Sequence, residues 1–434
     1  MIHTSAKISM LSNKFFRSEF LKNVLVLLTG TGLGQFITLL ASPILSRIYS
    51  PAEYGVFTLF VSTASMMAAI SAARYDLAIM LPKSTNHAIN VLMLAIYICV
   101  SFSLSLLMVA GLVALLIYFK VITLSLLMSQ WIGFFPFLVF LLGIQQIFNY
   151  WLIRNKQYRE VAITRITNSA SNNGLAILFG LLKFREWGIF LSNFIGQIIY
   201  FFNLYYFVRK LSKEDLQYVS SNKIKAKAEQ YKEFPRTSIS QAIVDMFQIN
   251  GIVYFLPIFF SIVEVGYYSR ALIVLQAPIS LLGNAFSQVF YQNASEVHNA
   301  KGDLRPLITS TIKKSVFVIL PICVLLMLFG PLLFSFVFGN QWEESGHYGR
   351  ILALWLFFDF IRLCVSSIPL ILNQQRRFFL ISILGPIILL ISMWMGYLMN
   401  DVHLALLLFA VGQSGLILYL LTWIYKIASP QKNG

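Results

Sequence analysis

The chain has 434 residues, of which 58% are hydrophobic and only 12% are charged, and its mean hydropathy is +0.74. A water-soluble protein of this composition would expose large apolar patches, so the composition excludes a soluble domain and indicates a polytopic membrane protein. The formal net charge of +16 would suggest a nucleic-acid partner in a soluble chain. The position of the cations along the chain therefore decides what that charge means.

A helix needs about 20 apolar residues to cross a bilayer, and by that measure the chain contains about twelve spans. The first half holds spans at approximately 24–47, 55–73, 89–118, 131–152, 161–182 and 187–208. The second half holds spans at approximately 239–261, 266–290, 315–337, 348–371, 378–399 and 403–425. The third span is long enough to predict a tilted or projecting helix. No cleavable signal peptide is expected, because the first apolar run is too long for one.

Two short segments recur half a chain apart and predict a duplication. Residues 43–57 are echoed by 257–268, and residues 152–159 are echoed by 370–377 in the same order. Because each half then has an even number of spans, both halves insert in the same orientation. We predict an all-α membrane protein with two six-helix lobes, at 1–208 and 237–434, related by a pseudo-twofold axis along the membrane normal.

The loops rich in Lys and Arg predict the orientation. The segment before the first span, the 209–236 segment and the loops around Arg154, Arg305 and Arg376 all fall on one side, which we assign to the cytoplasm with both termini. Most of the positive charge is then explained by the orientation of the loops in the membrane, and no nucleic-acid partner is expected. The basic 209–236 segment is interpreted as a cytoplasmic linker lying on the anionic inner leaflet, with a regulatory docking site as the alternative.

Polar residues form one face on the leading helix of each half. Thr31, Gln35, Thr38 and Ser42 share a face of the first span, and Gln241, Asp245 and Gln248 share a face of the seventh. Asn284 adds to a polar face of the eighth span. Polar side chains are costly in lipid, so these faces predict a polar cavity between the two halves. We predict that substrate binds there to Gln35, Thr38, Gln241, Gln248 and Asn284. Hydrogen bonding between helices of a solid bundle is the competing interpretation.

Cations outnumber acids within and at the ends of the spans. Arg47, Arg74, Arg165 and Arg270 are the residues concerned. A guanidinium binds phosphate oxygens through two parallel hydrogen bonds, so this pattern suits an anionic, phosphorylated headgroup. The alternatives are snorkelling to the interface for Arg74 and Arg165, and an ion pair with a neighbour for Arg270.

Two acids in the spans have different interpretations. Asp359 and Arg362 are spaced i, i+3 and predict an internal salt bridge. Asp245 has no cation within a helical turn, which makes it a candidate for coupling to a proton or Na⁺. A structural role for Asp245, as a protonated or hydrogen-bonded side chain, is the competing hypothesis.

No enzymatic site is evident in the sequence. Gly30-Thr-Gly-Leu-Gly34 lies inside an apolar span with no preceding strand, so it predicts close helix packing and not a phosphate loop. Cys99, Cys323 and Cys364 fall inside apolar runs and are interpreted as core residues. The histidines lack metal-ligand spacing. We expect no catalytic residue, no metal and no cofactor.

Several runs together closely resemble the bacterial O-antigen and oligosaccharide flippases of the Wzx type. These flippases belong to the multidrug/oligosaccharidyl-lipid/polysaccharide (MOP) exporter superfamily. The runs are 42–55 (SPILSRIYSPAEYG), 73–82 (ARYDLAIMLP), 150–158 (YWLIRNKQY), 233–235 (EFP), 266–270 (GYYSR) and 277–283 (APISLLG). The likeness covers nearly the whole chain.

The resemblance implies movement of undecaprenyl-diphosphate-linked oligosaccharide, such as an O-antigen repeat unit, across the bacterial cytoplasmic membrane by alternating access. It implies cationic cavity residues for the headgroup, which correspond here to Arg47, Arg74 and Arg270. Membrane lipids and the polysaccharide polymerase and chain-length machinery are the implied partners. A drug or cation antiporter of the same superfamily is the alternative, and a polymerase or ligase would need a large outer loop with catalytic residues.

Overall fold

The computed structural model describes residues 29–120, 131–184, 186–209, 217–300 and 302–429. Every regular element in these ranges is a helix. In the first half, residues 29–48 are helical, followed by α2 (Pro51–Ser71), α3 (Tyr75–Ala78), α4 (Thr85–Tyr118), α6 (Phe135–Arg154), α7 (Tyr158–Leu181) and α8 (Glu186–Val208). Each of the first six predicted spans therefore coincides with a long helix.

The second half follows the same plan. After α10 (Ser221–Gln230) and one π-helical turn (Phe234–Ser238) come α11 (Ile239–Phe259), α12 (Ile262–Asn299), α13 (Arg305–Phe338), α14 (Glu343–Val365), α15 (Ile368–Ile371), α16 (Gln375–Ser382), α17 (Leu384–Leu398) and α18 (Val402–Ile427). A short 3-10 turn, Asn340–Trp342, precedes α14. The predicted all-α membrane fold is confirmed, and the last six predicted spans each fall on these helices.

Nine helical segments of the described residues are long and apolar enough to cross a membrane. Three predicted spans are helical but are not among these nine segments: 29–48, α7 and α11. Helix α7 is rich in polar side chains, whereas only part of the first predicted span and only some of the side chains of α11 lie within what the structure describes. The chain is therefore a multi-pass membrane protein.

The helices form two compact units. Unit 1 comprises 1–41 and 63–243, and unit 2 comprises 42–62 and 244–434. The end of the first helix and the first half of α2 therefore pack with the second half of the chain. These units group residues that pack together, whereas the predicted boundaries at 208 and 237 divide the chain by its duplicated halves. The predicted boundaries stay a prediction.

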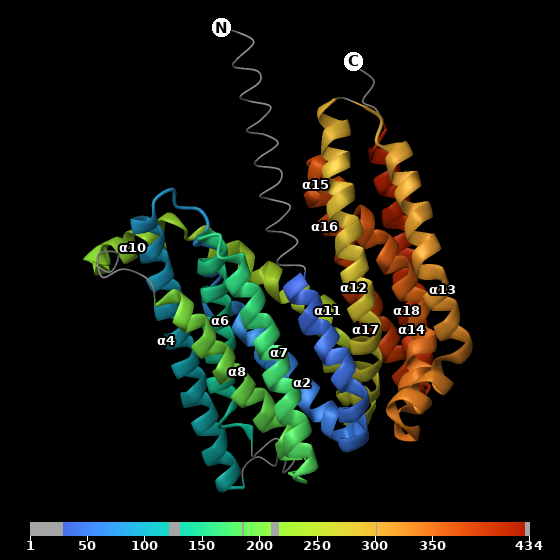
Figure 1. Cartoon of the computed structure of the whole chain (residues 1–434), viewed down its shortest axis with the longest axis horizontal. Coiled ribbons are helices and arrows are strands. Elements are labelled where there is room, and N and C mark those ends of the chain that lie inside the picture. Colours follow the sequence, from blue (N-terminus) through green and yellow to red (C-terminus); the bar gives the residue numbers. More distant parts are fainter. Residues whose placement is uncertain (1–28, 121–130, 185, 210–216, 301, 430–434) are drawn as a thin grey trace. The chain divides into compact units, whose positions relative to one another are not determined.

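Each unit has its own buried core and an apolar exterior. In unit 1 the core joins α4, α6 and α8 through residues such as Leu92, Ile147 and Leu204. In unit 2 it joins α12, α13, α15 and α18 through residues such as Phe290, Ile308 and Trp423. Figure 1 shows α7 beside α8 in unit 1 and α13 beside α14 in unit 2. Large apolar side chains such as Met108 and Phe317 remain exposed, as expected of surfaces that face lipid.

The duplication predicted from sequence echoes is visible in the helix lengths. Helices α4 and α13 each have 34 residues, and each is about 51 Å long, well beyond the hydrocarbon core of about 30 Å. The predicted overlong third span is therefore confirmed, and it has a matching partner in the second half.

The turns of the two halves repeat as well. Lys156 and Asn373 both have left-handed backbones, with φ values of 57° and 56°, two residues after a helix ends. Lys183 and Asn400 do the same with φ values of 61° and 52°. Both pairs are separated by 217 residues, since 373 − 156 and 400 − 183 are equal. The same helix-ending turns therefore occur at the same places in both halves.

The segments that begin α2 and α12 pack against each other inside unit 2. A Cβ added at Gly55 would overlap the carbonyl oxygen of Ile262, and a Cβ added at Gly266 would overlap the carbonyl oxygen of Pro51. The two contacts are reciprocal, because 266 − 55 and 262 − 51 both equal 211. Gly55 and Gly266 therefore allow two backbones to approach closely around a local pseudo-twofold axis.

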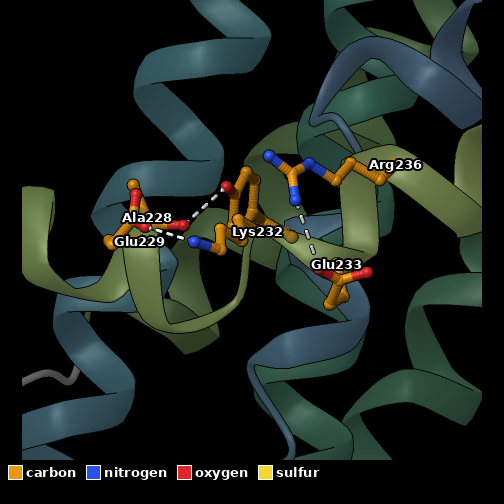
Figure 2. Close-up of polar contacts among 6 residues, drawn as sticks. Ala228, Glu229, Lys232, Glu233 and Arg236 are labelled. Atoms are coloured by element: carbon orange, nitrogen blue, oxygen red, sulfur yellow. Dashed lines mark hydrogen bonds and ion pairs between the residues drawn. The ribbon is translucent and has the colours of Figure 1, made fainter.

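The linker docks on unit 1. Ile224 and Ala228 of α10, with Tyr231 and Phe234, pack against the core of that unit, and the Tyr75 hydroxyl donates to the Ala228 carbonyl at 3.0 Å. The exposed side carries two ion pairs, Lys232 with Glu229 and Arg236 with Glu233 (Figure 2). Such exposed pairs contribute little to stability, so the apolar side of the linker holds it in place.

Candidate functional site

Arg270 is the most deeply buried cation among the predicted site residues, with 2% of its surface exposed. It lies on α12 in unit 2, two turns after the N-terminus of the helix. Its Nη1 donates to Ser42 Oγ at 2.5 Å. Its Nε and Nη2 atoms are buried and have no hydrogen-bond partner in the described part of the chain.

Aromatic rings enclose the Arg270 guanidinium. Its Cζ lies 4.0 Å from the ring centroid of Tyr54, 4.7 Å from that of Trp342 and 5.9 Å from that of Phe338. Rings attract a cation through their negative faces, and the attraction is worth about 2 kcal/mol or more when water is excluded. Tyr54, Trp342 and Phe338 therefore form an aromatic cage that offsets part of the cost of burying this charge.

The cage is held by hydrogen bonds to the end of the first helix. The Ser46 carbonyl accepts from Trp342 Nε1 and from Gln341 Nε2, each at 2.6 Å. The Ser46 hydroxyl in turn donates to the Phe338 carbonyl at 3.1 Å. Ser42 and Ser46, one turn apart, thus fix both the arginine and the rings around it.

The ion-pair interpretation of Arg270 is wrong for the part of the chain that the structure describes, where no carboxylate lies within 4.0 Å of it. The nearby acid Glu264 instead accepts a hydrogen bond from the Tyr348 hydroxyl. Arg270 is therefore a buried guanidinium with two unused donor atoms. An anion that reached it would find a strong, forked hydrogen-bonding partner.

Arg47 lies at the end of the same helix as Ser42 and is exposed. It follows Ser46 directly, so the backbone that carries it is fixed through the aromatic cage. Arg47 and Arg270 thus belong to one region of unit 2, in which the Arg270 side chain is enclosed and the Arg47 side chain is exposed.

A cavity of about 400 Å³ lies within unit 1. Its polar lining consists of Gln145, Gln146, Asn149, Tyr150, Arg165 and Tyr200. The single charged side chain among the residues that line it is a cation, Arg165. The cavity therefore suits neutral hydrogen-bonding groups or an anion, since a cationic cargo would call for carboxylates and none is among the described residues that line it.

The side chain of Arg165, on α7, is held in position by a hydrogen bond to the first helix (residues 29–48). Its Nη1 donates to Thr31 Oγ1 of the first helix at 2.6 Å. One turn on, Ser169 donates to the Gly34 carbonyl at 2.6 Å and lies 3.0 Å from Thr38 Oγ1, which also accepts from Asn173 at 3.1 Å. Thr38 thus takes part in hydrogen bonding between helices, which is the competing interpretation for this polar face.

The predicted glycine packing is confirmed at the same contact. A Cβ added at Gly30 would overlap the Ala162 side chain of α7. Gly30 therefore lets the first helix approach α7 closely, which is what brings Thr31 within reach of Arg165.

Arg74 and Asp76 lie at the short helix α3 between two spans. Arg74 has a left-handed backbone with φ of 62°, and its Nη1 donates to the Ala69 carbonyl at 3.4 Å. Asp76 is buried and accepts from Gln146 Nε2 at 2.7 Å. Burial raises the pKa of the Asp76 carboxyl, while the positive charge of Arg74 and the Gln146 hydrogen bond act in the opposite direction. Gln146 connects this acid to the cavity of unit 1.

The predicted salt bridge between Asp359 and Arg362 is confirmed. Asp359 Oδ1 lies 2.6 Å from Arg362 Nη2 and 2.9 Å from Arg362 Nε. Both residues line a second cavity, of about 390 Å³ within unit 2, together with Gln276, Trp355 and Gln413.

The remaining predicted site residues have different surroundings. Gln35 is partly buried, while Gln241 and Asn284 are exposed. The side chains of Asp245 and Gln248 lie outside what the structure describes, although the backbone of α11 is helical there. Their assignment to a substrate site and to ion coupling stays a prediction.

Sequence reasoning missed the aromatic cage and the polar lining of α6. Trp342 and Phe338 are distant in sequence from Arg270, and no local sequence pattern predicts that their rings contact its guanidinium. The polar face of α7 was detectable, because Arg165, Ser169 and Asn173 recur every four residues on one side of the helix.

Three solved structures share the fold of this chain. The lipid II flippase MurJ in an inward closed conformation has a TM-score of 0.71 and 14% identity over 92% of this chain and 87% of that one. An inward-facing multidrug resistance MATE transporter of the MOP superfamily has a TM-score of 0.64 and 13% identity over 92% and 94%. A MOP superfamily transporter from Pyrococcus furiosus has a TM-score of 0.63 and 13% identity over 95% and 97%. The chain therefore has the fold of MOP superfamily transporters.

The family model described as "Polysaccharide biosynthesis protein" matches residues 44–347. The chain belongs to this family, and the resemblance inferred from its motifs is confirmed at that level. A comparison with curated proteins gives no match.

Proposed function

We propose that the protein is a flippase that moves undecaprenyl-diphosphate-linked oligosaccharide, an O-antigen or other surface repeat unit, from the inner to the outer leaflet by alternating access. Membership of a polysaccharide biosynthesis family and a fold shared with a lipid II flippase support a lipid-linked cargo. The observation that carries the proposal is Arg270, a buried guanidinium with two unpartnered donor atoms and no carboxylate within 4.0 Å among the described residues.

The proposed role of Arg270 is to exchange partners during the cycle. In the closed arrangement its charge is held by the cage and by Ser42. When the surrounding helices part, the diphosphate replaces the rings with charge-assisted hydrogen bonds, which favour the open state by differential binding. Arg47, already exposed at the end of the first helix, adds a second cation to the same region. No bond of the cargo is made or broken, so the proposal needs no catalytic residue and no cofactor.

The test compares Arg270→Ala, Arg270→Lys and Arg47→Ala in cells whose surface polysaccharide depends on the protein. We expect Arg270→Ala to reduce surface polysaccharide about tenfold or more, from the loss of hydrogen bonds to a charged group. Lys should restore it only in part, because it lacks the planar fork, and Arg47→Ala should have a smaller effect. Membrane levels of each variant are measured in parallel, with the exposed Arg350→Ala as a matched control.

Full surface polysaccharide in the Arg270→Ala, Arg47→Ala double variant would contradict this assignment. Equal loss in Arg350→Ala would show that the effect is not specific to the site.

A drug or cation antiporter remains the second candidate, because multidrug transporters share the fold. Its specific support is Asp245 on α11, which we retain as the candidate for proton or Na⁺ coupling. Asp245→Asn keeps hydrogen bonding but cannot exchange a proton. If flipping in vesicles responds to an imposed ion gradient in the wild type and not in this variant, Asp245 couples transport, and equal responses would make it structural.

We further propose that the protein resides in the bacterial cytoplasmic membrane with both termini in the cytoplasm, as the basic loops predict. A C-terminal alkaline phosphatase fusion should be inactive, since this enzyme needs an oxidising compartment. High activity of the fusion in a functional protein would mean an odd number of spans.

A further inference from the structure

A cavity of about 700 Å³ opens at the N-terminal end of α13, in unit 2 and away from the arginine cage. Its side chains come from the first turns of α13 and from the last turn of α18. The residues used below are Arg305, Thr309, Lys313, Lys314 and Tyr425.

The lining of this cavity is cationic. It contains Arg305, Lys313 and Lys314 and a single carboxylate, Asp303, a balance of three positive charges to one negative. Asp303 Oδ1 is already used, because it accepts from the Arg305 backbone N–H at 3.0 Å. None of the three cations lies within 4.0 Å of a carboxylate in the part of the chain that the structure describes. Their mutual repulsion would be relieved by a bound anion.

The Arg305 guanidinium is held in position and still has a nitrogen that can donate a hydrogen bond. Its Cζ lies 5.5 Å from the ring centroid of Tyr425, which keeps the guanidinium against α18. Its Nε is buried without a hydrogen-bond partner among the described residues. The site also lies at the positive end of a 34-residue helix, where the Thr309 hydroxyl already donates to the Arg305 carbonyl at 2.9 Å. The unpartnered Nε of Arg305, the helix start and two lysines together suit a phosphate group.

The surface that continues from the cavity is apolar and exposed. Lys313, Phe317, Leu320, Val324 and Leu328 follow one another at spacings of four, three, four and four residues, so they share a face of α13. Phe317 is 82% exposed and Leu328 is 62% exposed. A ligand with a phosphate in the cavity would therefore lay hydrocarbon along about three turns of this helix. A soluble phosphate compound would make no use of that face.

We propose that this cavity binds the headgroup of an anionic glycerophospholipid, such as phosphatidylglycerol, with its acyl chains along the Phe317–Leu328 face. Basic pockets between membrane helices commonly hold such headgroups. In the proposed orientation the site lies in the cytoplasmic leaflet. The lipid is a resident of the protein surface and not the transported cargo, so this inference stands or falls independently of the flippase proposal.

The test uses the full-length protein in nanodiscs of phosphatidylethanolamine with a minor fraction of phosphatidylglycerol, followed by native mass spectrometry of the lipids it retains. We expect preferential retention of one phosphatidylglycerol. Each of Lys313→Gln and Lys314→Gln should weaken retention by about fivefold, and Arg305→Gln by at least as much. Lys426→Gln is the matched control, because Lys426 is an exposed cation at the same end of the unit that does not line the cavity.

Size-exclusion chromatography checks that each variant folds, and we expect the two lysine variants to fold because Lys313 and Lys314 are exposed. Equal retention of phosphatidylethanolamine and phosphatidylglycerol by the wild type would overturn the proposal. So would an equal loss in Lys426→Gln, which would show only diffuse attraction of the membrane surface. Displacement of the lipid by millimolar inorganic phosphate, or by equimolar undecaprenyl phosphate, would assign the cavity to a soluble anion or to the cargo instead.

Discussion

The segments that begin α2 and α12 share a local sequence pattern, but their matching side chains form different hydrogen bonds. Ser50 and Glu53 at the start of α2 correspond to Ser261 and Glu264 at the start of α12, again 211 residues apart. At α2 they form a reciprocal capping box, in which Glu53 Oε2 accepts from the Ser50 N–H at 2.6 Å and Ser50 Oγ accepts from the Glu53 N–H at 3.4 Å.

At α12 the same residue types do something else. Ser261 makes no capping hydrogen bond through its side chain, and Glu264 accepts from the buried Tyr348 hydroxyl of α14. Glu264 has a tertiary partner and Glu53 has a local one. A duplicated motif therefore kept its backbone packing, through Gly55 and Gly266, while the role of its acid diverged with its neighbours.

The largest expected effect tests the part that the two copies share. Gly55→Ala and Gly266→Ala each place a Cβ inside a backbone carbonyl oxygen of the other segment. Because backbone must move to make room, each should cost about 3 kcal/mol in free energy of unfolding. Thermal unfolding of the purified protein measures this.

The matched control for the glycine variants is Gly174→Ala in α7, where an added Cβ meets nothing within 4 Å. That helix position should gain slightly from the better helix propensity of Ala. If one of the two copies tolerated Ala as well as Gly174 does, the reciprocal contact would not hold the segments together.

The second prediction addresses the divergent acids. Glu264→Ala leaves the buried Tyr348 hydroxyl without its partner and should cost about 2 kcal/mol, whereas Glu53→Ala removes one cap and should cost about 1 kcal/mol. Adding Tyr348→Phe to Glu264→Ala should recover much of the loss, because no donor then remains unsatisfied.

A serine pair gives the same comparison independently. Ser50→Ala should destabilise by about 1 kcal/mol, and Ser261→Ala should leave the unfolding temperature unchanged, since Ser261 makes no side-chain cap. Equal losses at the two serines would mean that both copies are capped in solution.

The smallest expected effect concerns the repeated turns. Lys156 and Asn373 hold the same left-handed position after a helix, but Asn tolerates this backbone better than Lys. Lys156→Gly should therefore stabilise by about 0.5 kcal/mol, and Asn373→Gly by less. Chemical denaturation compares the two variants, with Lys426→Gly, in the last turn of α18, as a substitution within a helix that should destabilise. A larger gain at Asn373 would show that the two turns are not equivalent.

The sequence alone placed each of the twelve predicted spans on a helix, and nine of them are long and apolar enough to cross a bilayer within the described residues. It also predicted the i, i+3 pair of Asp359 and Arg362 and the close packing at Gly30, since both follow from helical spacing and residue size. The polar faces of the first helix and of α7 were each detectable, but which residues of the two faces pair with one another was not.

Only the tertiary structure decided how Arg270 is partnered. The rings around it come from segments near residues 54, 338 and 342, and no periodicity along one helix can report a contact between distant segments. The same holds for Glu53 and Glu264, whose identical spacing to a serine predicts a cap in both copies. Local sequence determines which conformations are available to the backbone, and the side chains that other helices bring close decide which hydrogen bonds form.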